Sequence, residues 1–176
     1  MVRVLRRVMG EATLDVHLMI EQPDRYAGDF IEAGADCLNV HLEARHQVAR
    51  TLASIRERGC RAGLAINPAT LLKHAIPLLP LCDQLICMTV NPGFGGQAFL
   101  PEVLPKIREA RDVIVLQNYN VDITVDGGVS DATAASCSAA RISSPRCTRR
   151  ASCSRPGRTP APSSSLTSPA CGTGLG

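Results

Sequence analysis

A glycine-rich loop follows one of the apolar runs of this sequence, and its residues are suited to binding an anion. The apolar run 85–88 is typical of a buried strand and is soon followed by an Asn-Pro-Gly turn signal. Three glycines lie within 93–96, and an amphipathic segment begins at Pro101. Glycine lets backbone N–H groups converge on an anion, because it accepts unusual φ angles and close approach. The pattern indicates an anion-binding loop, although a plain tight turn fits the same residues.

Two other runs that favour strands carry residues that can do chemistry. His17 and Met19 lie on one face of the run 14–20, and Asp126 follows the run 122–125. An imidazole and a carboxylate are common metal ligands and acid–base groups. Each residue also has a structural alternative: a strand His is more often a hydrogen-bonded core residue, Met fills cores, and an Asp before two glycines can cap a turn.

These residues are positioned by a repeated alternation of strands and helices. Apolar, β-rich runs predict strands at 14–20, 37–41, 62–66, 84–88 and 122–125. Helical spacing, with Pro or Gly near several of the ends, predicts helices at 23–34, 48–59 and 71–79, from 101 onward and over 129–137. Short links predict a parallel sheet, either doubly wound or a (β/α) barrel. In both folds the carboxyl ends of the strands gather the ligand-binding groups, so the three candidate segments should meet.

The charge distribution divides the chain into two parts. The net charge is +3, but six arginines and no acidic residue follow Asp131, which leaves 13 basic against 16 acidic residues before them. The segment 141–176 is rich in Ser, Pro and Arg and lacks apolar periodicity, which predicts a disordered tail after one domain over 1–140. The tail has no aromatic side chain to stack on a base, so we expect no nucleic-acid partner.

Other features of the sequence concern its environment. No run of about 18 apolar residues indicates a membrane span, and residues 1–10 lack the apolar core of a secretion signal. None of the eight cysteines has Cys-x-x-Cys or zinc-finger spacing. We therefore expect a cytoplasmic protein without a membrane partner, in which the cysteines are reduced.

Five short motifs occur in order along the chain. They are LDVHLMI at 14–20, GAD at 34–36, NPAT at 67–70, MTVNPGFGGQ at 88–97 and VDGGV at 125–129. Together they closely resemble the ribulose-phosphate 3-epimerase family, over roughly residues 2–140. The resemblance implies an incomplete TIM (β/α)8-type barrel with about strands three to seven present. It also implies the interconversion of D-ribulose 5-phosphate and D-xylulose 5-phosphate, so the expected partner is a small pentulose 5-phosphate.

The resemblance further implies roles for individual residues. His17 is similar to a ligand of a divalent metal, and Asp126 to both a metal ligand and a catalytic acid–base group. Substrate binding is implied for these two residues and for Met19, Met88, Gly93, Phe94, Gly95, Gly96, Gly127 and Gly128. The metal would be Zn²⁺, Fe²⁺, Mn²⁺ or Co²⁺, which stabilises an enediolate as a Lewis acid. Two carboxylates, one on each face of the sugar, would move the proton.

The chain also departs from the family pattern. That pattern begins two strands before His17, with a Ser-bearing strand and a His-x-Asp strand, and it ends in a Gly-Ser turn that should follow residue 140. We therefore expect reduced metal affinity and low turnover. One alternative is a non-catalytic protein that binds a sugar phosphate or pairs its open sheet edges in a homo-oligomer. Another is a related phosphate-binding synthase or aldolase, although Lys73 and Lys106 fall on predicted helices. A frameshift would account for the tail.

Overall fold

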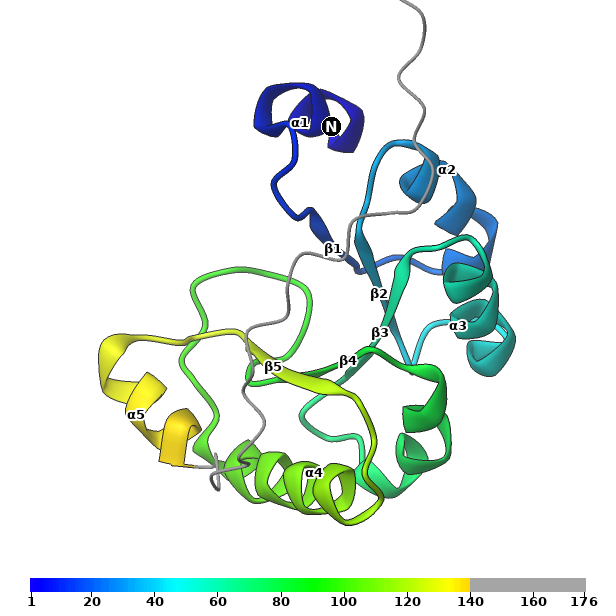
Figure 1. Cartoon of the computed structure of the whole chain (residues 1–176). Helices are drawn as coiled ribbons and strands as arrows, with labels where there is room; N and C mark the ends of the chain where they lie inside the picture. Colours follow the sequence, from blue (N-terminus) through cyan, green and yellow to red (C-terminus); the bar gives the residue numbers. More distant parts are fainter. Residues whose placement is uncertain (140–176) are drawn as a thin grey trace, which may run out of the picture.

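Five parallel strands form one curled sheet in the computed structural model, which describes residues 1–139 (Figure 1). The strands are β1 (Asp15–Leu18), β2 (Cys37–His41), β3 (Arg61–Ile66), β4 (Gln84–Met88) and β5 (Asp122–Asp126), and they lie side by side in that order. A doubly wound sheet reverses its strand order, whereas a barrel keeps the order of the chain. The fold is therefore an incomplete (β/α) barrel, as predicted.

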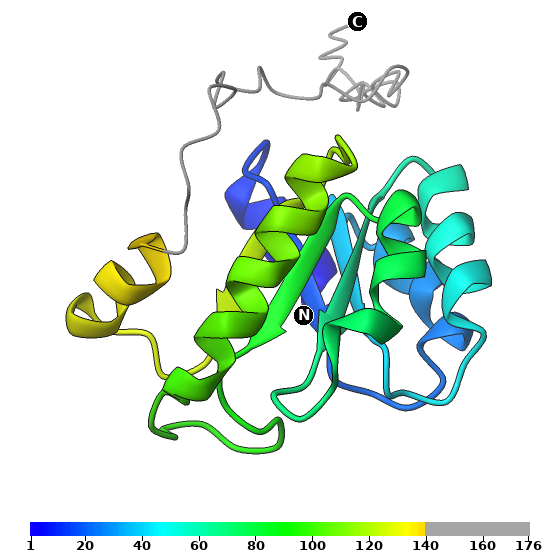
Figure 2. The same cartoon turned by 90° about the horizontal axis from the view of Figure 1, so that it is seen from below.

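The helices α2 (Ala27–Glu32), α3 (Val48–Glu57) and α4 (Leu104–Leu116) cover the convex side of the sheet, whereas α1 (Val2–Met9) and α5 (Asp131–Ala139) lie near its two open edges (Figures 1 and 2). The first three lie between strands, while α1 precedes β1 and α5 follows β5. Short 3-10 turns complete the connections at η1 (Pro23–Arg25), η2 (Leu72–His74), η3 (Ile76–Leu81) and η4 (Pro101–Val103). No helix within 1–139 is long and apolar enough to cross a bilayer. The predicted tail over 141–176 lies outside the described residues.

The connection between β3 and β4 differs from the prediction. An α-helix over 71–79 was expected, but the structure has the two 3-10 turns η2 and η3. Pro77 stands at the start of η3 and Pro80 inside it. Each proline lacks the N–H that an α-helical hydrogen bond needs, and its ring clashes with the preceding turn. The two prolines therefore limit this connection to short, tighter turns.

The main core lies between the sheet and the helices. Val48, Leu52 and Ile55 were expected to face inward from α3, and Leu52 and Ile55 are fully buried while Val48 packs against the same cluster. A second, smaller apolar cluster of Ala65, Ile86, Met88 and Val90 is separate from the main core. Cys37, Cys82 and Cys87 are buried free thiols. Burial keeps each thiol protonated, and it raises the pKa of Cys82 to about 12.

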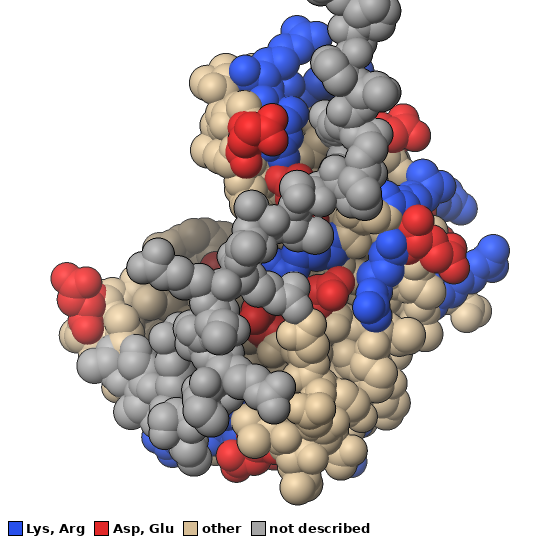
Figure 3. Space-filling model, in the orientation of Figure 1, with Lys and Arg blue, Asp and Glu red and all other residues tan. Residues whose placement is uncertain are grey.

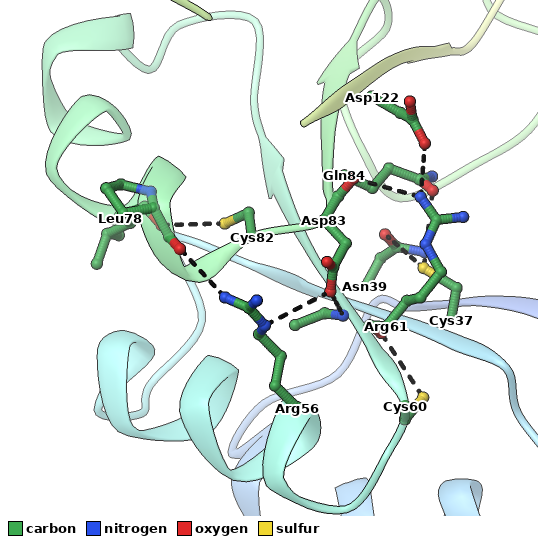
Figure 4. Close-up of polar contacts among 12 residues, drawn as sticks. Cys37, Asn39, Arg56, Cys60, Arg61, Leu78, Cys82, Asp83, Gln84 and Asp122 are labelled. Carbon is green, nitrogen blue, oxygen red and sulfur yellow. Dashed lines mark hydrogen bonds and ion pairs between the residues drawn. The ribbon is translucent and has the colours of Figure 1, made fainter. Parts of the chain in front are cut away.

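Ionic contacts connect the strands at their amino ends. Figure 4 shows Arg61 of β3 pointing at Asp122 of β5, and its guanidinium donates to that carboxylate at 2.6 Å. Asp83, just before β4, accepts the backbone N–H of Ala62 at 2.9 Å and lies 3.8 Å from Arg56. Figure 3 shows acidic and basic side chains next to each other near the centre of this view of the molecule. In a barrel, this end of the strands supports stability, and the opposite end holds the site.

Gly63 is required by the close packing of β2 against β3. It pairs with Asn39, and a Cβ at position 63 would lie 1.6 Å from Asn39 Oδ1. Asn39 is fully buried and donates to the carboxylate of Asp15 on β1. We expect Gly63→Ala to displace this side chain and to lower the free energy of unfolding by about 2–3 kcal/mol, measured by urea denaturation. Gly95→Ala is the matched control, because its Cβ would meet nothing within 4 Å. Equal stability of the two variants would contradict the prediction.

Candidate functional site

The side chains of His17 and Asp126 meet at the carboxyl ends of β1 and β5. These are the two edge strands of the described sheet, with three strands between them. Even so, His17 Nδ1 lies 3.3 Å from Asp126 Oδ2. The two edge strands, β1 and β5, come this close because the sheet is curled and their ends approach each other across its concave face. The structure therefore brings together two residues that are far apart in the sequence.

A pocket of about 350 Å³ opens beside Asp126. It is lined by Met19, Met88, the loop 90–97, Asp126, Gly127 and Gly128. Met88 is buried, whereas Met19 is half exposed and Phe94 is 74% exposed. Every substrate-binding residue expected from the sequence lines this pocket except His17, which contacts Asp126 from β1. A pocket of this size accepts a ligand such as a small sugar phosphate.

Hydrogen bonds hold the base of the glycine-rich loop against β5. The buried Thr89 donates its backbone N–H to Asp126 O at 2.8 Å, and its hydroxyl lies 2.5 Å from Gly127 O. At the tip, Gln97 Nε2 donates to Asn91 O at 2.6 Å and to Phe94 O at 2.9 Å. The loop is therefore closed on itself and fixed beside the catalytic candidate Asp126.

The backbone N–H groups of this loop are available to a ligand. Within residues 1–139, no protein atom accepts a hydrogen bond from the N–H of Gly93, Gly95 or Gly96. All three glycines line the pocket. Several N–H groups around one hollow form an anion-binding concavity of the kind that holds phosphate. The wall of the pocket therefore carries N–H groups that have no protein acceptor within residues 1–139.

Gly127 and Gly128 allow the end of β5 to pass close under the loop. Both have positive φ, 112° and 62°, a conformation that side chains disfavour. A Cβ on Gly128 would lie 2.5 Å from the backbone N of Phe99, and one on Gly127 would lie 2.3 Å from Val90. The turn that carries Asp126 therefore has no room for a larger residue.

His41 contacts His17 at the site, although it was not selected as a candidate from the sequence. It ends β2, is buried, and its Nε2 lies 2.9 Å from Nε2 of His17. The two rings are stacked, with centroids 4.9 Å apart. Burial lowers the pKa of His17 below its ordinary value, the nearby His41 ring lowers it further, and the Asp126 carboxylate opposes both. One sequence signal could have identified His41 as a site residue, namely its position at the carboxyl end of a strand.

Glu43 lies behind His41 and is held by several donors. Burial would raise the pKa of its carboxyl, but hydrogen bonds from His41, Thr70 and the backbone of Asn67 outweigh burial and lower this pKa to about 2. Because the pKa is depressed on folding, the carboxylate stabilises the fold above pH 4.5 and loses this effect as the pH falls towards 2.

We expect Glu43→Gln to remove the loss of stability at low pH that Glu43 causes. The free energy of unfolding of the parent chain should fall more than that of the variant between pH 4.5 and 2. The difference should be below about 1 kcal/mol, because partial exposure of the carboxylate screens its interactions. Urea denaturation across this range measures it. Parallel pH dependences for the two proteins would show that the Glu43 contacts do not affect stability.

Lys106 makes structural hydrogen bonds to the loop after β3. Its Nζ donates to the carbonyls of Asn67, Pro68 and Thr70, each at 2.8 Å. Burial lowers its pKa, but all three N–H donors of the ammonium group already have acceptors. This arrangement fixes the loop after β3 and argues against a Schiff-base role for Lys106.

The donor pair His17 Nδ1 and Asp126 Oδ2 is chemically suited to a divalent cation. An imidazole nitrogen and a carboxylate oxygen are ligands that Zn²⁺, Fe²⁺, Mn²⁺ and Co²⁺ accept. Within 1–139, no group of three or more His, Cys, Asp or Glu side chains is placed to hold an ion. Among the described residues, this pair therefore offers two donor atoms to a cation.

Comparison with known proteins identifies the family of this chain. The sequence model of the ribulose-phosphate 3 epimerase family matches residues 1–144. The chain belongs to this family. Ribulose-phosphate 3-epimerase of Synechocystis sp. is 50% identical over 125 residues, which cover 70% of this chain and 54% of that protein. The epimerase of Escherichia coli K12 is 46% identical over 125 residues, covering 71% and 56% respectively. The chain spans about half the length of these epimerases.

A solved structure supports the fold of this epimerase-family chain. The 3-keto-L-gulonate-6-phosphate decarboxylase of Vibrio cholerae superposes with a TM-score of 0.51 and 16% sequence identity. The match covers 79% of this chain and 76% of the decarboxylase. At this identity the likeness concerns the fold alone, and it agrees with the incomplete barrel described above.

Proposed function

We propose that the pocket binds a pentulose 5-phosphate and that Asp126 moves the proton at C3, as in the interconversion of D-ribulose 5-phosphate and D-xylulose 5-phosphate. The observation that carries the proposal is the position of the Asp126 carboxylate in the wall of a glycine-lined pocket, 3.3 Å from His17. A base beside a phosphate-binding loop is the arrangement that enolisation of a phosphorylated ketose requires.

The loop and the methionines orient the substrate. The N–H groups of Gly93, Gly95 and Gly96 bind the phosphate, and this remote binding energy holds the reacting carbon near Asp126. Met88 and Met19 line the pocket next to the loop. Their polarizable, apolar side chains accept the planar enediolate without attracting its polar groups.

Asp126 acts on one face of the sugar. Its carboxylate takes the proton from C3, and the electron pair of the C–H bond moves into the C2–C3 bond while the C2 carbonyl oxygen becomes negative. Among the described residues that line the pocket, Asp126 is the one carboxylate. Return of the proton to the same face restores the original epimer, and return to the opposite face completes the epimerisation.

The pair of His17 and Asp126 would hold the divalent ion, Zn²⁺, Fe²⁺, Mn²⁺ or Co²⁺, with reduced affinity because it provides two ligands. When bound, the ion supplies Lewis-acid stabilisation of the charge on the substrate oxygens. The chain's own contribution is to hold the imidazole and the carboxylate side by side at the pocket wall.

Proton exchange in D₂O tests the proposal. The purified chain is incubated with ribulose 5-phosphate and Mn²⁺ or Zn²⁺, and NMR follows deuterium at C3 while a coupled assay follows xylulose 5-phosphate. Deuterium incorporation that exceeds xylulose formation would support proton transfer at one face. Equal rates would mean that a second acid acts on the opposite face. Absence of both would overturn the proposed chemistry.

The single pocket carboxylate also favours a second candidate function, which is binding of the sugar phosphate without turnover. In that case, ribulose 5-phosphate or inorganic phosphate should raise the midpoint of thermal unfolding, because a ligand that binds the folded state stabilises it. Protection without deuterium exchange would select this candidate, and exchange would exclude it.

A further inference from the structure

We propose that Thr89 is a positioning residue, whose side-chain hydroxyl holds the glycine-rich loop and the turn that carries Asp126 in one fixed arrangement. Thr89 directly follows β4, is fully buried and does not line the pocket. It can therefore affect a ligand only through its neighbours. The inference rests on the proposed function, because it concerns how the base and the phosphate-binding loop of that site come to face the same pocket.

Both ends of the glycine-rich loop are attached to Thr89. The loop 90–99 begins directly after this residue, and at its other end Leu100 donates its backbone N–H to Thr89 O at 2.9 Å. Thr89 in turn donates its own N–H to Asp126 O at 2.8 Å. The main chain of one residue thus joins the start of the loop, the end of the loop and the end of β5.

The hydroxyl of Thr89 adds a contact that the main chain does not make. Thr89 Oγ1 lies 3.0 Å from Asp126 O and 2.5 Å from Gly127 O. A hydroxyl has one proton to donate, and Asp126 O already accepts the backbone N–H of Thr89. Within residues 1–139, no other group donates to Gly127 O. The hydroxyl proton therefore belongs to the shorter contact, with Gly127 O.

The turn after Asp126 needs such a contact because its own residues do not fix its conformation. Gly127 and Gly128 both have positive φ, and glycine adopts positive and negative φ about equally readily. A side chain at position 127 cannot stiffen the turn, because its Cβ would lie 2.3 Å from Val90 Cγ2. The hydroxyl of Thr89 thus selects the conformation in which Asp126 and both glycines line the pocket.

Thr89→Val tests the hydrogen bond itself, because it removes the hydroxyl and keeps the size and the β-branch of the side chain. Gly127 O would lose its donor, while the backbone bonds at position 89 remain. We expect inorganic phosphate to bind about 10-fold more weakly, measured by the shift of the thermal midpoint over a series of phosphate concentrations. At saturating ribulose 5-phosphate, deuterium exchange at C3 should be about 10- to 100-fold slower, because a small displacement of the base has a large effect on the rate.

Two further variants separate positioning from a general loss of stability. Thr89→Ser keeps the hydroxyl and should restore most of the phosphate affinity and of the exchange. Thr51→Val is the matched control, because Thr51 is also buried and donates its hydroxyl to a backbone carbonyl, that of Gln47 at 3.1 Å, but lies on α3 outside the pocket. It should lower the thermal midpoint, as Thr89→Val does, because each variant loses a buried hydrogen bond. It should leave phosphate affinity and exchange unchanged.

NMR spectra of the ligand-free chain separate this inference from the proposed function. The amide signals of Gly127 and Gly128 should be broadened in Thr89→Val, because a turn that interconverts on the μs–ms timescale broadens its signals, and sharp in the parent and the other two variants. Such broadening in a chain whose parent neither binds phosphate nor exchanges deuterium would retain the positioning role and reject the proposed function. If Thr89→Val keeps the sharp signals, the phosphate affinity and the exchange of an active parent, the positioning role alone is wrong. It is also wrong if Thr89→Ser behaves like Thr89→Val.

Discussion

Asp126→Asn should lower the rate of deuterium exchange into ribulose 5-phosphate by about 10²- to 10⁴-fold. The amide keeps the size of the carboxylate but has no useful basicity, so the C3 proton loses its acceptor. Because the side chain of Asp126 is 46% exposed, the substitution does not leave a buried group without a partner, and the fold should be retained. The measurement is the NMR signal of the C3 proton in D₂O, with and without added Mn²⁺.

Asp122→Asn is the control for this experiment, because Asp122 begins the same strand at the opposite end of the sheet. It pairs with Arg61, its side chain is 66% exposed, and it is not among the residues of the pocket. We expect the rate of exchange to stay within about twofold of the parent, since an exposed ion pair contributes little to stability. If Asp126→Asn retains the rate of this control, the base is another residue and the proposed role of Asp126 is wrong.

The arrangement of strands could be predicted from the sequence because it depends on local patterns. The runs 37–41 and 84–88 coincide with β2 and β4, and both strands are buried along their whole length. Such strands are nearly continuous apolar runs, which are visible without knowledge of the partners. The choice between a doubly wound sheet and a barrel depends on strand order, which is a long-range property. The structure settles it with the order β1 to β5.

The candidate site could be predicted only in part. The rule that parallel strands present ligand groups at their carboxyl ends, together with the family motifs, selected the loop and Asp126, which line one pocket. His41 was missed because its partner on β1 is distant in sequence, and a lone His gives no sign of whether it faces another ring. Glu43 was missed for the same reason: its donors come from the segment after β3. Residues that act through a neighbour become apparent only when that neighbour is placed.

Gly128→Ala should weaken the binding of phosphate and of ribulose 5-phosphate by about 10- to 100-fold. The new Cβ would lie 2.5 Å from Phe99 N and 2.8 Å from Phe99 Cα, which are backbone atoms and cannot move alone. The segment that closes the glycine loop must shift, and the N–H groups at 93–96 shift with it. The shift in the midpoint of thermal unfolding at a series of phosphate concentrations measures this affinity.

Gly59→Ala separates this steric effect from simple backbone strain. Gly59 also has positive φ, 74° against 62° for Gly128, but a Cβ there would meet nothing within 4 Å. Gly59→Ala should lose about 1 kcal/mol of stability, because alanine disfavours positive φ, and Gly128→Ala should lose more, because its Cβ also meets the backbone of Phe99. Only Gly128→Ala should also lose protection by phosphate, since the turn at Gly59 lies between α3 and β3, away from the pocket. If both variants keep the parent response to phosphate, the anion does not bind at the glycine loop, and the pocket must be assigned another ligand.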